Sequence, residues 1–166
     1  MKTDTPASAQ EVLFPHRVFV VSKRDILEGH PEEGARPTAW RYVIDTESEA
    51  PTAAEVADHA DFHRLAKIVE GPLAQGTMDW VARLQADESA SELELNALRV
   101  PELGVFALWL RGPDGSSERF IPLRAPASLG EEETFEPKAW WDRLKALAED
   151  DETFDDRPEV PALKSR

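Results

Sequence analysis

The segment of residues 105–110 constrains the fold more than any other part of the chain. All six residues are apolar, so a strand built from them is expected to be buried on both faces and to lie in the centre of a sheet. The turn at residues 112–116 contains Asp-Gly, which supplies the positive φ values that a hairpin requires. Residues 119–123 are therefore predicted to return as an antiparallel strand, with Pro122 at an edge or a bulge because proline cannot donate to the ladder.

Three further segments have the composition or the alternation of strands, namely residues 17–22, 40–45 and 92–97. The last of them alternates strictly between polar and apolar residues, which is typical of a strand with one face in water. Residues 29–37 contain two glycines and two prolines and are predicted to form a loop. Together with the hairpin, these segments predict a sheet of about five strands.

Three regions are predicted to be helical. The first covers residues 51–70, where Thr52 and Glu55 have the spacing of a capping box and apolar residues recur at helical spacing. The second covers residues 73–86, and a glycine near its start could divide it in two. The third begins at Pro137, since proline is tolerated in the first turn of a helix. The apolar face of this last helix contains Trp140, Trp141, Leu144, Leu147 and Ala148.

Strands and helices are segregated along the chain, in the order β-β-α-α-β-β-β-α. This order predicts an α+β fold, with three or four helices packed on one face of a mainly antiparallel sheet. A dinucleotide-binding fold would need regular alternation of strand and helix. We expect three parts: a disordered leader over residues 1–12, a single α+β domain over residues 13–149, and an acidic, flexible tail over residues 150–166.

The charge of the chain argues against several classes of partner. The 19 Lys and Arg residues against 33 Asp and Glu residues give a formal net charge of −14, and no window has the dense basic patch that a phosphate backbone requires. We therefore expect no binding to nucleic acid or to an anionic membrane surface. The longest strongly apolar run is also far shorter than the ~20 residues of a membrane span.

The common motifs for cofactors and covalent catalysis are missing from the sequence. There is no cysteine, which excludes disulfides and thiolate chemistry. There is also no Gly-x-Ser-x-Gly, Walker or Gly-x-Gly-x-x-Gly pattern. We expect no cofactor and, because the first residues have no secretory apolar region, a cytoplasmic location. The excess of arginine over lysine and the abundant alanine favour a bacterial source with a GC-rich genome.

One pair of histidines has the spacing of a metal site. His59 and His63 lie four residues apart and would share a face of the predicted helix, as in many helical zinc sites. An alanine stands where metalloproteases carry a glutamate after the first histidine, and a third imidazole would have to come from His16 or His30. The alternative is an acidic helix surface that carries two exposed histidines. Asp45, at the end of a predicted strand, is a candidate catalytic carboxylate.

The acidic residues are concentrated toward the C-terminus. Residues 125–166 contain 12 acidic and 6 basic side chains, a net charge of 6 − 12 = −6 in 42 residues. The preceding 124 residues have a net charge of 13 − 21 = −8. The charge density therefore rises about twofold around the tryptophan-bearing last helix, and such a surface can steer and select a basic partner.

We therefore predict a non-catalytic interaction protein of a bacterial type, such as an inhibitor, an immunity-like protein, an adaptor or a dedicated chaperone. Its partner would be another protein with a basic surface. The residues expected to bind that partner are aromatic or acidic: Trp140, Trp141, Glu131, Glu132, Glu133, Glu149, Asp150, Asp151 and Glu152. Two alternatives stay open, a small-molecule-binding or metal-dependent enzyme with a site near His59 and His63, and a structural subunit of a larger assembly. The sequence does not indicate an oligomeric state.

Overall fold

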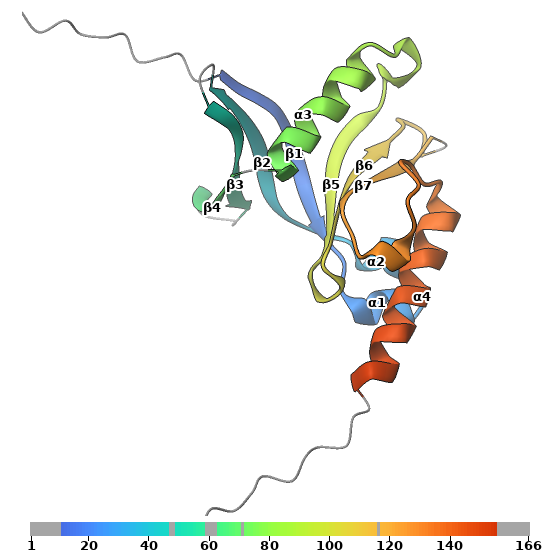
Figure 1. Ribbon diagram of the computed structural model, residues 1–166. Coiled ribbons are helices and arrows are strands. Elements are labelled where there is room, and N and C mark those ends of the chain that lie inside the picture. The colour runs from blue at the N-terminus through green and yellow to red at the C-terminus, as the bar shows by residue number, and fades with distance from the viewer. Residues whose placement is uncertain (1–10, 47–48, 59–62, 71, 116, 156–166) are drawn as a thin grey trace, which may run out of the picture.

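A computed structural model describes residues 11–46, 49–58, 63–70, 72–115 and 117–155. Within this part of the chain, seven strands form one sheet in the order β4-β3-β2-β1-β5-β6-β7 (Figure 1). Neighbouring strands are antiparallel except for β1 and β5, which are parallel. The expected α+β class with a mainly antiparallel sheet is thereby confirmed. The strands are β1 (Glu11–Val20), β2 (Arg36–Thr46), β3 (Glu49–Asp58), β4 (His63–Glu70), β5 (Glu94–Val100), β6 (Val105–Arg111) and β7 (Arg119–Arg124).

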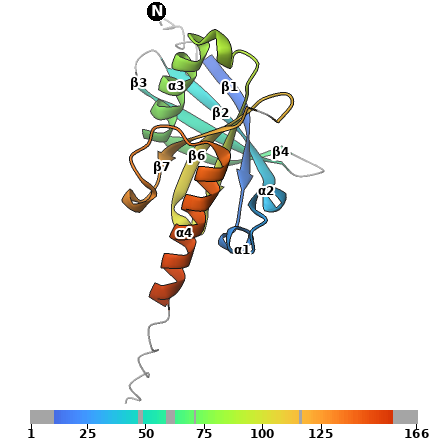
Figure 2. The same ribbon diagram turned by 90° about the vertical axis from the view of Figure 1, so that its right-hand side faces the viewer.

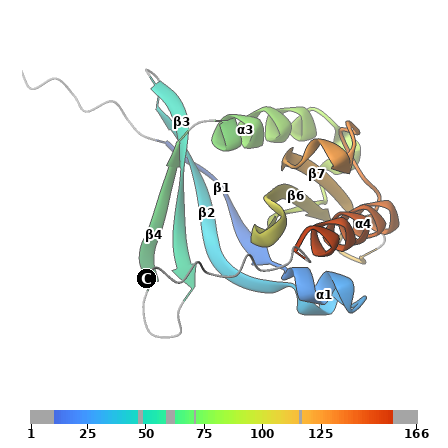
Figure 3. The same ribbon diagram turned by 60° about the horizontal axis from the view of Figure 1, so that its bottom comes forward.

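The helices lie on both faces of the sheet rather than on one as expected. They are α1 (Lys23–Leu27), α2 (Pro31–Gly34), α3 (Pro72–Gln85) and α4 (Pro137–Asp155). The reason is visible in β6, where alternate side chains face different helices. Residues 105, 107 and 109 pack with Trp140 and Leu144 of α4, whereas residues 106, 108 and 110 pack on the opposite side with Leu73 and Trp80 of α3. Figure 3 shows α3 and α4 on the two sides of this part of the sheet.

The core on the α4 side is built from stacked aromatic rings. Phe120 of β7 lies between Trp109 of β6 and Trp140 of α4, with ring centroids 5.5 Å and 5.2 Å away. Phe135 adds a fourth ring, 5.6 Å from that of Trp140. Helix α4 runs across β6 and β7 with α1 beside it (Figure 2). This face is therefore closed by apolar packing.

The predicted helix over residues 51–70 is wrong. Residues 49–58 and 63–70 form strands β3 and β4 instead. Burial in β3 has a period of two, with Ala53 and Glu55 buried and their neighbours partly exposed. Pairing of β3 with β2 over most of its length overrides the helix preference of the alanines and glutamates in this segment. Glu55 consequently has no capping role.

The hairpin of β6 and β7 is confirmed, and so is the edge position of Pro122, because β7 ends the sheet. However, β6 is next to the edge rather than central. It is buried on both faces because α3 and α4 cover it from opposite sides. Helix α3 continues through Gly76, whose position is close to Leu123 of β7. No helix among the described residues is long and apolar enough to cross a membrane.

Helical structure extends beyond the expected bounds at two places. The short helix α2 lies in the predicted loop, and α4 continues to Asp155, well into the segment expected to be a flexible tail. Strand β1 begins at Glu11, inside the predicted leader. The remainder of the leader and residues 156–166 lie outside the described part of the chain.

Candidate functional site

A row of polar side chains crosses the face of the sheet that α3 covers. His16 of β1 is the register partner of Arg41 of β2, and Arg41 is the register partner of Glu55 of β3. Direct partners in an antiparallel ladder share a face, so the three side chains lie side by side. Their relative exposures are only 1%, 1% and 4%. Burying titratable side chains is costly unless they form hydrogen bonds or ion pairs. The residues that pair with these three side chains therefore belong to the site.

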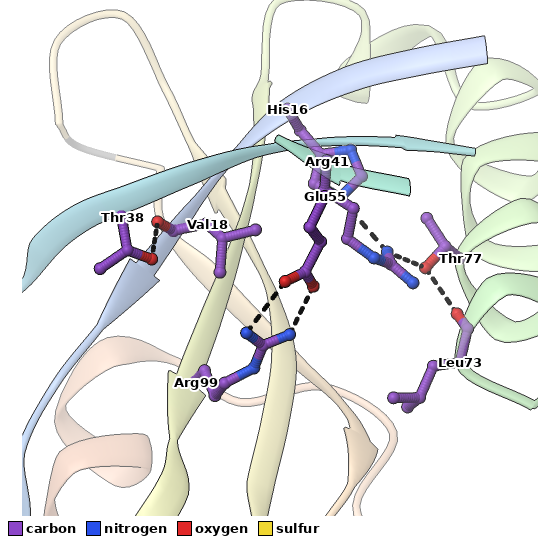
Figure 4. Close-up of polar contacts among 8 residues, drawn as sticks. All are labelled: His16, Val18, Thr38, Arg41, Glu55, Leu73, Thr77 and Arg99. Atoms are coloured by element: carbon purple, nitrogen blue, oxygen red, sulfur yellow. Dashed lines mark hydrogen bonds and ion pairs between the residues drawn. The ribbon is translucent and has the colours of Figure 1, made fainter. Parts of the chain in front are cut away.

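A chain of hydrogen bonds holds Arg41 between the sheet and α3 (Figure 4). Its Nη1 donates to Thr77 Oγ1 at 2.9 Å and lies 3.3 Å from His16 Nε2. The Thr77 hydroxyl donates in turn to the carbonyl of Leu73 at 2.7 Å. His16 Nδ1 lies 2.6 Å from the carbonyl of Phe14, so Nδ1 carries the proton and Nε2 accepts from Arg41. Arg41 is thus fixed through one of its terminal nitrogens.

The backbone of β1 is distorted where it places His16. The register of β1 against β2 shifts between Leu13 and His16, and Phe14 has a φ of 53°. A left-handed conformation at a residue other than glycine stores strain of about 1–3 kcal/mol and is common at functional sites. The imidazole placed in this way is neutral, because burial lowers the pKa of His16 to about 4.

The second guanidinium of the site is held by Glu55. Arg99 of β5 donates from Nη1 to Oε2 at 3.2 Å and from Nη2 to Oε1 at 2.5 Å, which is the two-pronged geometry of a strong arginine–carboxylate pair. The guanidinium carbons of Arg41 and Arg99 lie 5.1 Å and 5.3 Å from the centre of the Phe106 ring. Both cations therefore share the same aromatic neighbour.

The charges at this place, two of them buried and that of Arg99 partly exposed, do not balance. Arg41 and Arg99 are two cations, Glu55 is one anion, and His16 is neutral. Arg41 Nη2 is buried without a hydrogen-bond partner among the described residues. Burial lowers the pKa of Arg41 to about 10, with Glu55 acting in the opposite direction, so the group still carries its charge at neutral pH. The site consequently has an uncompensated positive charge and an unused donor.

The two arginines and Glu55 line a cavity of about 290 Å³. This volume is close to the lower limit for small-molecule sites. The cavity opens to solvent beside Arg124 of β7 and the turn between β5 and β6, both of which are exposed. Leu73, in the first turn of α3, also contributes, so the positive end of the helix dipole lies nearby. The lining residues are Arg41, Glu55, Leu73, Arg99, Pro101, Gly104, Val105, Phe106 and Arg124.

This arrangement has groups that can hold an anion. Arginine stays protonated in proteins, and Glu55 is occupied by Arg99. Both ring nitrogens of His16 are engaged, and His16 is not part of the cavity lining. The lining contains no serine, threonine, lysine or tyrosine that could serve as a nucleophile.

The two tryptophans of the predicted binding surface have different environments. Trp140 is fully buried in the aromatic stack, so it is not available to a partner. Trp141 is half-buried, and its Nε1 donates to Glu32 Oε1 of α2 at 3.1 Å. A groove of about 430 Å³ lies beside it between α2 and α4.

Several acidic residues of the predicted surface are engaged within the molecule. Glu132 lies 3.8 Å from Arg143, Glu133 lies 3.8 Å from Arg83, and Asp151 forms an ion pair with Lys23 at 2.8 Å. Their own cations thus neutralise part of this surface. Glu131 is exposed in the loop before α4, Glu149 and Asp150 are exposed on α4, and Glu152 belongs to the same helix.

The structure does not bring the predicted metal ligands together on a helix. His63 begins strand β4, and His59 lies outside the described residues. His30 is exposed at the start of α2. His16 lies beside Arg41, Glu55 and Arg99, which together with it form what we call the arginine cluster. Asp45 lies in β2 opposite Glu11 and does not line the cavity. Within the described segments, no group of three His, Cys, Asp or Glu residues could hold a metal ion.

The sequence reasoning missed the arginine cluster. In residues 40–45 the aromatic and aliphatic side chains of Trp40, Tyr42 and Ile44 alternate with Arg41 and Val43, which suggests that the first set is buried. The structure has the opposite arrangement, with Arg41 and Val43 buried and the other three partly exposed. The one usable signal in the sequence is Arg41, a charged residue inside a predicted strand; Arg99 lies beyond the end of the strand predicted over residues 92–97.

Comparison with known proteins adds no relative. A scan against protein-family models, a search of curated proteins and a search of solved structures each found no match.

Proposed function

We propose that this protein binds a small anionic ligand in the arginine-lined cavity and does so without catalysing a reaction. The observation that carries the proposal is the imbalance of two guanidiniums, one buried and one partly exposed, against one carboxylate, together with the unpartnered Nη2 of Arg41. A buried cation without a counter-charge is costly. A ligand that supplies one negative group would offset that cost and would leave a carboxylate available for the free donor of Arg41.

The acidity of the whole protein is compatible with an anion site. Charges beyond about 8 Å are largely screened at physiological ionic strength, so the −14 net charge slows the approach of an anion more than it weakens the bound state. In the cavity Arg41 and Arg99 stand against Glu55, a balance of 2 − 1 = +1, and the exposed Arg124 adds a third, water-screened cation to the lining. The negative surface would also repel anions that do not bind the guanidiniums of the cavity.

The test is thermal stabilisation by a simple anion at constant ionic strength. A ligand that binds only the folded state raises the melting temperature, so sodium benzoate or sodium phosphate is expected to raise it relative to sodium chloride. Arg41→Met should remove most of this rise. Arg24→Met is the matched control because it deletes the same charge from a side chain that is 83% exposed, and it should leave the rise intact. Equal rises in all three proteins, or no rise at all, would contradict the proposal.

A second candidate function is binding of a protein with a basic surface, and the half-buried Trp141 beside its groove favours it. Tryptophan is enriched at the centres of interfaces, and exposed acidic residues of α4 lie on the same helix. Capture of a partner from the native lysate should weaken at high salt and be lost with Trp141→Ala. Capture that is indifferent to both changes would remove this candidate.

A further inference from the structure

We infer that the ligand of the cavity is a carboxylate and that it binds by exchange of partners. The ligand carboxylate takes the place of Glu55 on Arg99, and the Glu55 carboxylate turns to the free Nη2 of Arg41. This inference rests on the proposed function and adds the class of ligand and the role of Glu55 as an internal competitor.

The position of Glu55 means that its carboxylate needs to move only a short distance to change partner. Arg41 and Glu55 are direct register partners, which places their Cβ atoms about 4.5–5.5 Å apart. Figure 4 shows the Glu55 side chain directed toward Arg99, with Arg41 beside it. Its two oxygens bond Arg99, while Arg41 Nη2 beside it has no partner among the described residues. A rotation of one side chain is therefore enough to change its partner.

The accessibility of the two arginines decides which of them meets the ligand. The Arg99 side chain is 27% exposed, whereas Arg41 is 1% exposed and is held by Thr77. A ligand that enters from solvent reaches Arg99 first, and Arg99 is the guanidinium that Glu55 occupies. The ligand must therefore compete with Glu55.

The charge count selects a monoanion. With one ligand carboxylate the site contains the guanidiniums of Arg41 and Arg99 and two carboxylates, those of Glu55 and the ligand. Each cation then has its own anion. A phosphate dianion would give this set of groups a net charge of −1 and would depend on the exposed Arg124, whose charge is screened by water. Arg99 already holds a planar carboxylate through two parallel bonds, so a second carboxylate reproduces that geometry.

The experiment is a calorimetric titration with sodium benzoate and, separately, sodium phosphate. Glu55→Gln removes the competitor and should tighten benzoate binding by about tenfold, the equivalent of one charge-assisted hydrogen bond. Glu118→Gln is the matched control, because Glu118 is also an ion-paired glutamate with little exposure but lies on the hairpin beside Arg111. It should leave the affinity for benzoate unchanged.

The role of Arg41 is tested in two backgrounds. Arg41→Met should weaken benzoate binding about tenfold in the natural protein, because Glu55 then has no alternative partner. In the Glu55→Gln background the same change should alter the affinity by less than about threefold, since no carboxylate needs to move. A direct contact between ligand and Arg41 would instead cost the same in both backgrounds and would overturn the exchange.

The outcomes separate the two proposals. Absence of benzoate and phosphate binding in every protein would contradict the proposed function itself. Binding that Glu55→Gln leaves unchanged or weakens, or phosphate that binds more tightly than benzoate, would contradict only the carboxylate exchange. If a variant fails to fold, the ¹³C shift of the Glu55 carboxyl carbon in the unaltered protein gives the same answer. It should change on saturation with benzoate, and a constant shift would overturn the exchange.

Discussion

The two faces of the sheet are buried by different means. On the side of α4, Trp140, Phe120 and Trp109 form a continuous aromatic stack. On the side of α3, the strands β1, β2 and β3 present His16, Arg41 and Glu55 to the interior. Among the described residues, the buried charges lie on the second face, which also contains the solvent-connected cavity. A face whose sole task is stability has no need for that charge, because apolar residues of similar size stabilise as well or better.

The difference suggests that the two faces of the sheet have different roles. The aromatic face is held by apolar packing, whereas the face under α3 combines apolar packing with buried charge, and that charge is the basis of the proposed binding site. The strained backbone at Phe14 is consistent with this reading, since it lies on the polar face and positions His16. Four predictions can break or sharpen the contrast.

The largest effect is expected on the aromatic face. Trp140→Ala removes a fully buried ring and should lower the free energy of unfolding by about 3–5 kcal/mol. Trp141→Ala, one residue along the helix and half-buried, should cost about 1 kcal/mol. Denaturation in urea measures both. Similar losses for the two variants would show that the stack is not what holds α4 to the sheet.

A pH titration tests the polar face. The folded state keeps His16 neutral down to a pKa of about 4, whereas the unfolded chain takes up the proton near pH 6.5. The unfolded state thus binds more protons between these values, so stability is full above pH 6.5 and falls as the pH drops toward 4. The loss amounts to about 3 kcal/mol.

The contribution of His16 is isolated by His16→Gln, which should remove that part of the pH dependence. His30→Gln is the matched control because the His30 side chain is 69% exposed, and it should retain the full slope. Denaturation midpoints at several pH values between 4 and 7 measure the effect. A slope that survives in His16→Gln would mean that His16 is not the buried neutral group described above.

A smaller change in stability is expected from Arg41→Met. The substitution removes the excess buried cation and leaves the neutral pair of Arg99 and Glu55. The loss of the hydrogen bonds to Thr77 and His16 is offset by the removal of a desolvated charge, so the free energy of unfolding should change by no more than about 1 kcal/mol while anion binding weakens. A loss above about 3 kcal/mol, measured by denaturation, would make Arg41 a structural residue and undo the contrast.

The smallest effect belongs to the acidic surface of α4. Asp151→Asn breaks the ion pair with Lys23, and since Asp151 is about half-exposed the cost should be below about 1 kcal/mol. The effect should shrink further in high salt. A large, salt-independent loss would show that the end of α4 is fixed by this contact.

The sequence predicted the elements whose pattern is set locally. The apolar strand at residues 105–110, the Asp-Gly turn and the helix after Pro137 were all placed correctly, because each has a period and a stop signal of its own. Residues 51–70 were placed wrongly, since alanine and glutamate favour helices and only pairing with β2 makes them strands. That pairing is a tertiary effect that no local window contains.

The site could not be predicted for the same reason. Arg41, Glu55 and Arg99 come from β2, β3 and β5, so their meeting depends on the strand order. Glu55 also fell in the segment that was assigned to a helix. The sequence predicts that Trp140 and Trp141 differ in exposure, because adjacent helix residues point about 100° apart. Which of them is buried depends on tertiary packing, since Phe120 contacts both rings and Phe135 packs on Trp140.

The most direct test of the account is a titration of the arginine side-chain Nε–Hε signals by NMR, with sodium benzoate at constant ionic strength. If the cavity lacks one negative charge, the Arg99 and Arg41 signals should move together and saturate with a single dissociation constant. The signals of Arg24 and Arg83, which lie on the surface, should stay in place. Shifts that do not saturate, or that are equal for all four arginines, would contradict the claim that the polar face is a binding site.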